Sequence, residues 1–272
     1  MVLVLAMLLS AAPDYGAHIA AQKKRYGVGV KDLDVVVEAP FVVWGDAGPV
    51  QLARSAENTV RWAVQHLEAE FFPRRPTAIH DIFLFKDAAS YQRHARALWG
   101  DTPSTPYGYA SSTNRVLVMD ISTGGGTLVH ELVHPYVAAN FPAAPTWLNE
   151  GLASLFEQSA ERDGKMVGLT NWRLAGLQEA LREKKVEPFA ALVAGDDDAF
   201  RNEDEAVHYA QARYLMLYLQ ENGKLRPFIQ RALEQQQQDP TAATALRQTL
   251  GAAEWKGLDD GFRRWVPTLH FP

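Results

Sequence analysis

The chain has 272 residues, of which 47% are hydrophobic and 22% are charged, a composition that excludes disordered, collagen-like and polytopic membrane proteins. Lys and Arg number 27 against 32 Asp and Glu, for a net charge of −5, so the broad basic surface typical of nucleic-acid binding is not expected. The chain has no cysteine. Disulfides, iron–sulfur clusters and cysteine nucleophiles are therefore excluded, and any metal site must be built from His, Asp and Glu.

The N-terminal segment resembles a secretion signal in composition. Residues 2–9 are apolar and are followed by small residues at 10–12, the order of a signal-peptide core and its cleavage region. The apolar run is too short for a transmembrane helix. Residues 1–17 are therefore interpreted as a signal peptide or an N-terminal apolar segment. We expect export to the periplasm or secretion, and a cytoplasmic location is the alternative.

Between residues 31 and 120 the pattern is mixed, with short β-rich runs between helical ones. The predicted elements are a strand over 41–44, an amphipathic helix over 53–72, a strand over 79–85, a helix through Tyr91 and Ala97, and hairpin strands over 107–110 and 115–119. Ser112, Thr113 and Asn114 are predicted to form the hairpin turn. The 107–110 run is a candidate edge strand that an extended peptide could pair with.

After residue 120 the β signal fades and helical periodicity dominates. Helices are predicted over 128–137, 146–158, 172–182, 206–220, 225–233 and 252–265. A sheet followed by helices indicates an α+β fold. We expect one domain over residues 18–272, with a sheet lobe over about 31–137 and a helical lobe over about 144–272.

The chemistry is concentrated in the first of these helices, which reads His130-Glu131-Leu132-Val133-His134. Residues four apart lie almost above one another on a helix, so both imidazoles project from the same face. The pattern is that of a zinc-binding helix with a glutamate beside the metal. Three glycines at 124–126 precede the helix and are predicted to form a tight turn into it.

The third ligand is the decisive question, because catalytic zinc usually takes three protein ligands and keeps one open position. No His, Asp, Glu or Cys lies between His134 and Glu150, so Glu150 is the first available ligand. Glu157 shares a helical face with it and is the alternative. Position 140, where another pattern requires a third histidine, is Asn140. Gly151 inside the second helix predicts a close approach to the first helix.

These two motifs carry a family resemblance. His130-Glu131-x-x-His134 together with Asn149-Glu150-Gly151-x-Ala153 resembles the gluzincin zinc metallopeptidases, the thermolysin and aminopeptidase side of the zincin fold. The order of elements over residues 41–266 resembles more closely the bacterial peptidase-MA-like group. The resemblance implies a zincin-like fold, with an N-terminal mixed sheet and a mainly helical C-terminal lobe. It also implies one zinc per chain bound by His130, His134 and Glu150.

The resemblance further implies peptide-bond hydrolysis, with a peptide or protein as substrate. Glu131 would act as general base towards the attacking water and then as general acid towards the leaving amine. Zinc lowers the pKa of its bound water to about 7. A side chain of the helical lobe would stabilise the oxyanion; Tyr209 is favoured and His208 is the alternative, because helix neighbours point about 100° apart. Arg213, one turn further, is interpreted as a solvated side chain.

The sequence departs from the family pattern at two positions. Pro135 directly follows the second histidine and removes a helical hydrogen bond to the carbonyl of Glu131, so we expect a kink. Thermolysin-like enzymes carry an acidic residue one turn after the glutamate ligand, where it orients a metal-binding histidine. That position is Ser154 here, so Ser154 or Glu157 is predicted to take over the orienting contact.

Three other functions remain open. An aminopeptidase is less favoured than an endopeptidase, because the chain has no segment like G-x-M-E-N that anchors a substrate amino terminus. A zincin scaffold that binds zinc without turnover would keep the same ligands. A zinc amidase acting on cell-wall amides would also keep them, although no cell-wall-binding repeat is visible. No stable membrane insertion is expected, and the oligomeric state is not predicted.

Overall fold

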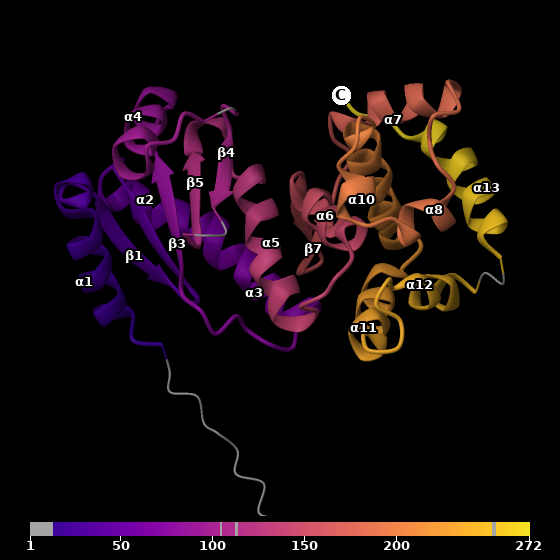
Figure 1. The fold of residues 1–272 in the computed structure, drawn as a ribbon, viewed down its shortest axis with the longest axis horizontal. Coiled ribbons are helices and arrows are strands. Elements are labelled where there is room, and N and C mark those ends of the chain that lie inside the picture. The colour runs from indigo at the N-terminus through magenta and orange to yellow at the C-terminus, as the bar shows by residue number, and fades with distance from the viewer. Residues whose placement is uncertain (1–12, 104, 112–113, 252–253) are drawn as a thin grey trace, which may run out of the picture.

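A mixed sheet of five strands forms the centre of the N-terminal half of the computed structural model, which describes residues 13–103, 105–111, 114–251 and 254–272 (Figure 1). The strands are β1 (Asp34–Glu38), β2 (Phe41–Gly45), β3 (His80–Phe85), β4 (Gly108–Ser111) and β5 (Val116–Asp120), in the order β1-β2-β3-β5-β4. The central strands β2, β3 and β5 are parallel, while β1 and β4 are antiparallel edges. The prediction of an edge strand before the hairpin is confirmed; residues 112 and 113 of its turn lie outside the described residues.

Helices cover both faces of the sheet because its central strands are apolar on both sides. Val42 and Trp44 face a cluster with α1 (Tyr15–Tyr26), the 3-10 turn η1 (Gly27–Val30) and α4 (Ala88–Trp99). Phe41 and Val43 face the larger core. This larger core contains α2 (Pro49–Ser55), a π-helical segment (Ala56–Arg61), α3 (Trp62–Glu70) and α5 (Gly126–Asn140).

The position of α1 changes the predicted lobe boundary. Tyr15, Ile19 and Tyr26 of α1 pack against the sheet core, so the sheet lobe begins near Tyr15 and not near residue 31. The predicted end of the N-terminal segment, between residues 17 and 18, falls inside α1. Most of that predicted signal segment, residues 1–12, lies outside the described residues.

The C-terminal half is mainly helical, as predicted, and the coarse α+β class is confirmed (Figure 1). After the short turn η3 (Ile121–Thr123) and α5, the helices are α6 (Thr146–Phe156), α7 (Arg173–Arg182), α8 (Phe189–Ala194), α9 (Asp197–Phe200), α10 (Glu205–Glu221), α11 (Leu225–Gln235), α12 (Ala243–Leu250), α13 (Trp255–Trp265) and the 3-10 turn η4 (Val266–Thr268). Figure 1 shows α5 and α6 where the two halves meet. None of the helices in the described residues is long and apolar enough to cross a membrane.

The sequence predicted no particular strand after residue 120, but the structure contains two short ones. A second sheet of two short strands, β6 (Ser159–Arg162) and β7 (Lys165–Gly168), follows α6. The turn between them is Asp163-Gly164, with φ values of 52° and 66°. Asp-Gly favours the positive φ values of a tight hairpin turn. The hairpin is short and β6 is largely exposed, so it lacks the alternating apolar pattern of a longer strand.

Gly151 permits a close helix contact, but with a different partner from the one predicted. A Cβ atom on Gly151 would lie 2.9 Å from the carbonyl oxygen of Ala212 and 3.2 Å from its Cβ. Ala212 belongs to α10, not to α5. The glycine therefore fixes α6, which carries Glu150, against α10, which carries Tyr209.

Gly151→Ala is expected to destabilise the protein by about 1–3 kcal/mol, because the added methyl overpacks a backbone contact. The free energy of unfolding in urea measures this. Gly176→Ala is the matched control: Gly176 also lies inside a helix, but a Cβ there meets nothing within 4 Å. It is expected to stabilise the protein by about 0.5–1 kcal/mol through helix propensity. Equal effects of the two substitutions would contradict the close approach of α6 to α10.

Candidate metal centre

Two helices supply the residues at the centre of the molecule. His130 and His134 lie on α5, and Glu150 lies on the neighbouring α6. The predicted glycine turn is confirmed: β5 ends at Asp120, Gly124 has φ of 105°, and α5 begins at Gly126. A Cβ atom on Gly126 would collide with the carbonyl oxygen of Glu157. Glycine at this position therefore lets the start of α5 reach the end of α6.

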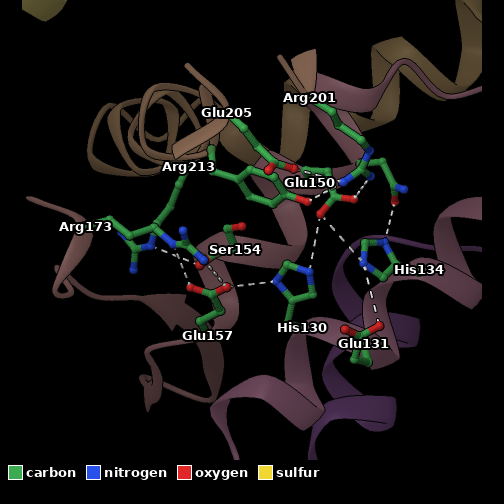
Figure 2. Close-up of polar contacts among 12 residues, drawn as sticks. His130, Glu131, His134, Glu150, Ser154, Glu157, Arg173, Arg201, Glu205 and Arg213 are labelled. Atoms are coloured by element: carbon green, nitrogen blue, oxygen red, sulfur yellow. Dashed lines mark hydrogen bonds and ion pairs between the residues drawn. The ribbon is translucent and has the colours of Figure 1, made fainter. Parts of the chain in front are cut away.

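The donor atoms of the three residues converge. His130 Nε2 lies 3.4 Å and His134 Nε2 lies 3.9 Å from Glu150 Oε2 (Figure 2). All three donor atoms lie within 4.8 Å of one another, and no other such group of His, Asp and Glu occurs among the described residues. Glu150 Oε2 is buried without a hydrogen-bond partner, although buried polar atoms are normally bonded. A cation bound by these atoms would satisfy that oxygen, so the three residues could hold a metal ion.

Each histidine has an orienting contact on its other ring nitrogen. His134 Nδ1 lies 2.9 Å from Asn149 Oδ1. Because an amide oxygen can only accept, Nδ1 carries a proton, which leaves Nε2 as the nitrogen that could bind a cation beside Glu150. His130 Nδ1 lies 3.1 Å from Glu157 Oε1, an ion-pair distance outside hydrogen-bond geometry. Such contacts typically fix the orientation of metal-binding histidines.

The sequence predicted that either Ser154 or Glu157 would orient a histidine. In the structure Glu157 contacts His130, and Ser154 does not. The Ser154 hydroxyl is buried without a partner. Arg173 donates two hydrogen bonds to Glu157, from Nη2 to Oε1 at 2.9 Å and from Nε to Oε2 at 3.1 Å. Burial would raise the pKa of Glu157, but the contacts with His130 and Arg173 outweigh it and lower that pKa. Glu157 is therefore ionised and faces His130 with a full negative charge (Figure 2).

Opposing effects also act on the two groups that meet at the centre. Burial would lower the pKa of His130, but the carboxylates of Glu150 and Glu157 raise it. Burial would raise the pKa of Glu150, whereas the neighbouring His130, His134 and Arg201 lower it. Glu150 is therefore a carboxylate at neutral pH, the form in which it can ligate a cation.

Arg201 is a functional residue that sequence reasoning missed. Its Nη2 donates to Glu150 Oε1 at 2.9 Å, and its Nη1 donates to the Tyr209 hydroxyl at 3.0 Å. Asp197, one turn earlier, accepts from its Nε at 3.0 Å. Arg201 directly follows α9, a helix of four residues, 51 positions after Glu150. No spacing rule connects such positions, so only the tertiary fold reveals the contact.

The two candidate oxyanion donors have different surroundings. Tyr209 lines the cavity at the centre, and burial and the nearby Glu150 raise the pKa of its hydroxyl. His208 is buried away from this cavity, with Nδ1 2.9 Å from the carbonyl oxygen of Phe200. The structure thus brings Tyr209 to the cluster and excludes His208 from it. Their separation agrees with the angle between neighbours on a helix.

Arg213 is not solvated, contrary to the sequence interpretation. Its side chain is fully buried. The guanidinium donates to the carbonyl oxygens of Ser154, Leu155 and Leu169. Two of these carbonyls, of Ser154 and Leu155, belong to the last turn of α6, where carbonyls lose their partners within the helix; the Ser154 carbonyl also accepts from the backbone N–H of Glu157. Burial lowers the pKa of Arg213 to about 10. Arg213 therefore caps the helix that carries both Glu150 and Glu157.

An open cavity of about 670 Å³ adjoins the centre. Its wall contains the three converging residues, Glu131, Tyr209, Arg201 and the edge strand β4. Glu131 Oε2 lies 4.0 Å from His134 Nε2, so this carboxylate is beside the donor atoms without being one of them. The helix α5 continues through Pro135 to Asn140, so the proline does not end the helix that carries these residues.

Glu157→Gln is expected to weaken metal binding by about 10–100-fold, because the orienting charge on His130 is lost while all three donor atoms stay. Titration with zinc in competition with a chromogenic chelator measures the dissociation constant. Glu161→Gln is the matched control, since Glu161 lies on β6 and contacts His66 and Trp62 instead. An unchanged constant in Glu157→Gln would contradict the orienting role.

Comparison with known proteins gives one family match. Residues 125–241 match a family model described as a protein of unknown function, DUF1570. This segment contains α5, α6, Arg201 and Tyr209, and therefore every residue of the metal centre. Comparison with curated proteins found no match.

Proposed function

We propose that this chain is a zinc metallopeptidase of the gluzincin type, with a zincin-like fold. One observation carries the proposal. The donor atoms of His130, His134 and Glu150 converge, and the carboxylate of Glu131 lies 4.0 Å from one of them in an open cavity. A metal site that binds only for structure would have no need of an acid–base group beside an open position.

The donor set fits zinc. Two imidazole nitrogens and one carboxylate oxygen are the three protein ligands of a common catalytic zinc site. Ligands bound at about 2.0–2.2 Å in a tetrahedron lie about 3.3–3.6 Å from one another. Glu150 Oε2 lies 3.4 Å from His130 Nε2 and 3.9 Å from His134 Nε2, which is close to these distances. When bound, zinc supplies a water with a pKa near 7 and polarises the carbonyl of the substrate.

Glu131 is the acid–base group of the proposed reaction. It belongs to the same helix as the two histidines, so its carboxylate is held beside them. In the proposed reaction it accepts a proton from the attacking water and then donates that proton to the leaving amine. This matches the role that the sequence predicts for it.

Tyr209 is the proposed oxyanion donor. Its pKa is raised by burial and by the charge of Glu150, so its hydroxyl keeps its proton at neutral pH. Arg201 donates to the same hydroxyl oxygen at 3.0 Å, which holds the hydroxyl in the wall of the cavity. A preorganised donor of this kind stabilises charge that develops in the transition state.

The edge strand β4 supports a peptide as the substrate. Within the described part of the chain, β4 is the last strand of the sheet and pairs only with β5. Its residues Tyr109, Ala110 and Ser111 lie in the cavity wall together with residues of β5. An extended peptide can add to such an edge through main-chain hydrogen bonds. Edge pairing in the middle of a chain suits an endopeptidase more than an enzyme that holds a substrate terminus.

A chelator experiment on blocked peptides tests the proposal. The purified protein is incubated with peptides blocked at both ends, and the products are identified by mass spectrometry with chelator, without it, and after zinc is restored. We expect internal cleavage that the chelator abolishes and zinc restores. Zinc binding without any cleavage would favour the non-catalytic scaffold, and cleavage of cell-wall amides alone would favour the amidase. Cleavage only of peptides with a free amino terminus would identify an aminopeptidase.

A further inference from the structure

The cavity at the metal centre is one part of a longer groove. A second cavity of about 450 Å³ shares His130, Glu131 and Tyr209 with it. A third cavity of about 530 Å³ in turn shares lining residues with the second, among them Tyr107 and Trp172. The metal centre therefore lies between two substrate-sized spaces, one along β4 and one beyond Glu131. We call the second cavity the lateral pocket.

Two exposed aromatic side chains line the lateral pocket. Tyr107 is 54% exposed and Trp172 is 56% exposed, among the few large apolar side chains that the described residues expose to this degree. They come from opposite halves of the molecule, one just before β4 and the other just before α7. The faces of Trp and Tyr bind both apolar groups and cations. The charge of the pocket decides between these two ligands.

The lateral pocket is acidic, whereas the cavity along β4 is balanced. Its lining has three carboxylates, Glu131, Glu157 and Glu205, against one cation, Arg173. Arg173 is already held by both oxygens of Glu157. The β4 cavity, by contrast, has two carboxylates and two arginines in its wall.

Glu205 is the carboxylate with capacity for a ligand. Its side chain is 47% exposed, and its one ion pair is a long contact of 3.4 Å between its Oε1 and Arg201 Nη1. Arg201 makes shorter contacts with Glu150 and Tyr209. A cation entering the pocket would therefore meet a partly free carboxylate in a lining that also contains Tyr107 and Trp172. Figure 2 shows Glu205 near Arg201.

We propose that the lateral pocket is a specificity subsite for a basic side chain, Lys or Arg, of the substrate residue next to the cleaved bond. The cationic group pairs with Glu205 and contacts the face of Tyr107. The ring of Trp172, over which Arg173 already lies at 5.6 Å from the centroid, bounds the pocket. An apolar side chain would cover the carboxylate without pairing it, which is unfavourable. An acidic side chain would be repelled by the net negative charge of the lining, because Arg173 compensates only one of the three carboxylates. This inference rests on the proposed peptidase function and names the substrate class for that site.

Cleavage of matched peptides tests the subsite. Five versions of one doubly blocked peptide are made. They differ only at the position next to the cleaved bond, which is Lys, Arg, Leu, Phe or Glu. We expect kcat/KM to be about tenfold higher for Lys and Arg than for Leu, since a cation–π contact and an ion pair act together. Glu205→Gln removes most of that preference through KM, and Glu205→Lys reverses it towards Glu. Glu203→Lys is the control, because Glu203 is exposed on the same turn and lines none of the three cavities.

A binding measurement separates failure of the subsite from failure of the peptidase proposal. Fluorescence anisotropy of the same peptides, labelled, is recorded with Glu131→Gln, which lacks the acid–base group but keeps Glu205, Tyr107 and Trp172 of the pocket. We expect the Lys peptide to bind about tenfold more tightly than the Leu peptide. Cleavage with a preference for Leu or Phe would overturn the subsite and leave the peptidase. If no peptide is cleaved but the Lys peptide binds selectively and this binding depends on Glu205, the peptidase proposal is overturned. The proposal that the pocket binds basic side chains then stands.

Discussion

Glu131→Gln is expected to lower the rate of peptide hydrolysis by a factor of about 10²–10⁴, the usual contribution of general acid–base catalysis. Glutamine has the same shape but cannot accept a proton at neutral pH. Because Glu131 lies 4.0 Å from the nearest histidine nitrogen and is not one of the three converging donors, the variant should keep one zinc per chain. Kinetics on a blocked peptide and metal analysis of the same preparation measure the two effects together.

The control for this prediction is Glu203→Gln, an exposed carboxylate outside the cavities. It should leave both rate and zinc content unchanged. Loss of zinc from Glu131→Gln would instead identify Glu131 as a ligand. Full activity with zinc retained would remove the proposed acid–base role.

Glu150→Gln is expected to weaken zinc binding by more than the 10–100-fold loss expected from an orienting residue such as Glu157. Glu150 Oε2 is the oxygen that faces both histidines, and it has no other partner. Substitution by glutamine removes the anionic ligand and leaves Arg201 without its partner at 2.9 Å. Chelator competition measured on Glu150→Gln and Glu157→Gln side by side gives the ranking.

The ranking of these two variants also decides between the two ligands that the sequence allows. Glu150 and Glu157 lie seven residues apart on α6 and its end, so they share one face. The structure has Glu150 Oε2 against the Nε2 atoms and Glu157 Oε1 against the Nδ1 atom of His130. Loss of zinc in Glu157→Gln with zinc retained in Glu150→Gln would reverse the assignment.

The cluster of His130, His134 and Glu150 was predictable from sequence, because it depends on local spacing. Two histidines four residues apart must share a helix face, and the stretch without ligands up to Glu150 leaves a single nearest carboxylate. The strands β2 and β3 were predictable for a similar reason, since they are short apolar runs bounded by turn residues. Their parallel pairing could not be derived from these runs.

The contacts that orient the cluster were not predictable, because they depend on tertiary packing. Asn149, which contacts His134, directly precedes Glu150 in the chain. Its position beside Glu150 was the one sequence signal that could have identified it as an orienting residue. Arg201 comes from a separate segment, directly after α9, and had no such signal. The choice between His208 and Tyr209 required the rotation of α10, which is buried on most of its surface. An all-round apolar helix has no pattern that tells which side faces a cleft.

Two further differences have physical reasons. The pairing of Gly151 with Ala212 could not be read from the sequence, because a helical glycine indicates close packing but not its partner. The helix α1 has no buried residue of its own, although its partly buried Tyr15 and Ile19 contact the sheet. Its weak amphipathic pattern therefore gave no prediction of a helix. The predicted start of the sheet lobe, near residue 31, consequently lay too far along the chain.

Anomalous X-ray diffraction at the zinc absorption edge, from crystals of the purified protein, tests the central claim most directly. We predict one peak per chain, about 2.0–2.2 Å from His130 Nε2, His134 Nε2 and Glu150 Oε2, the distances of zinc ligands, with the carboxylate of Glu131 beside the open position. A zinc-supplemented crystal with no peak at these three residues, or with its peak at other residues, would contradict the account.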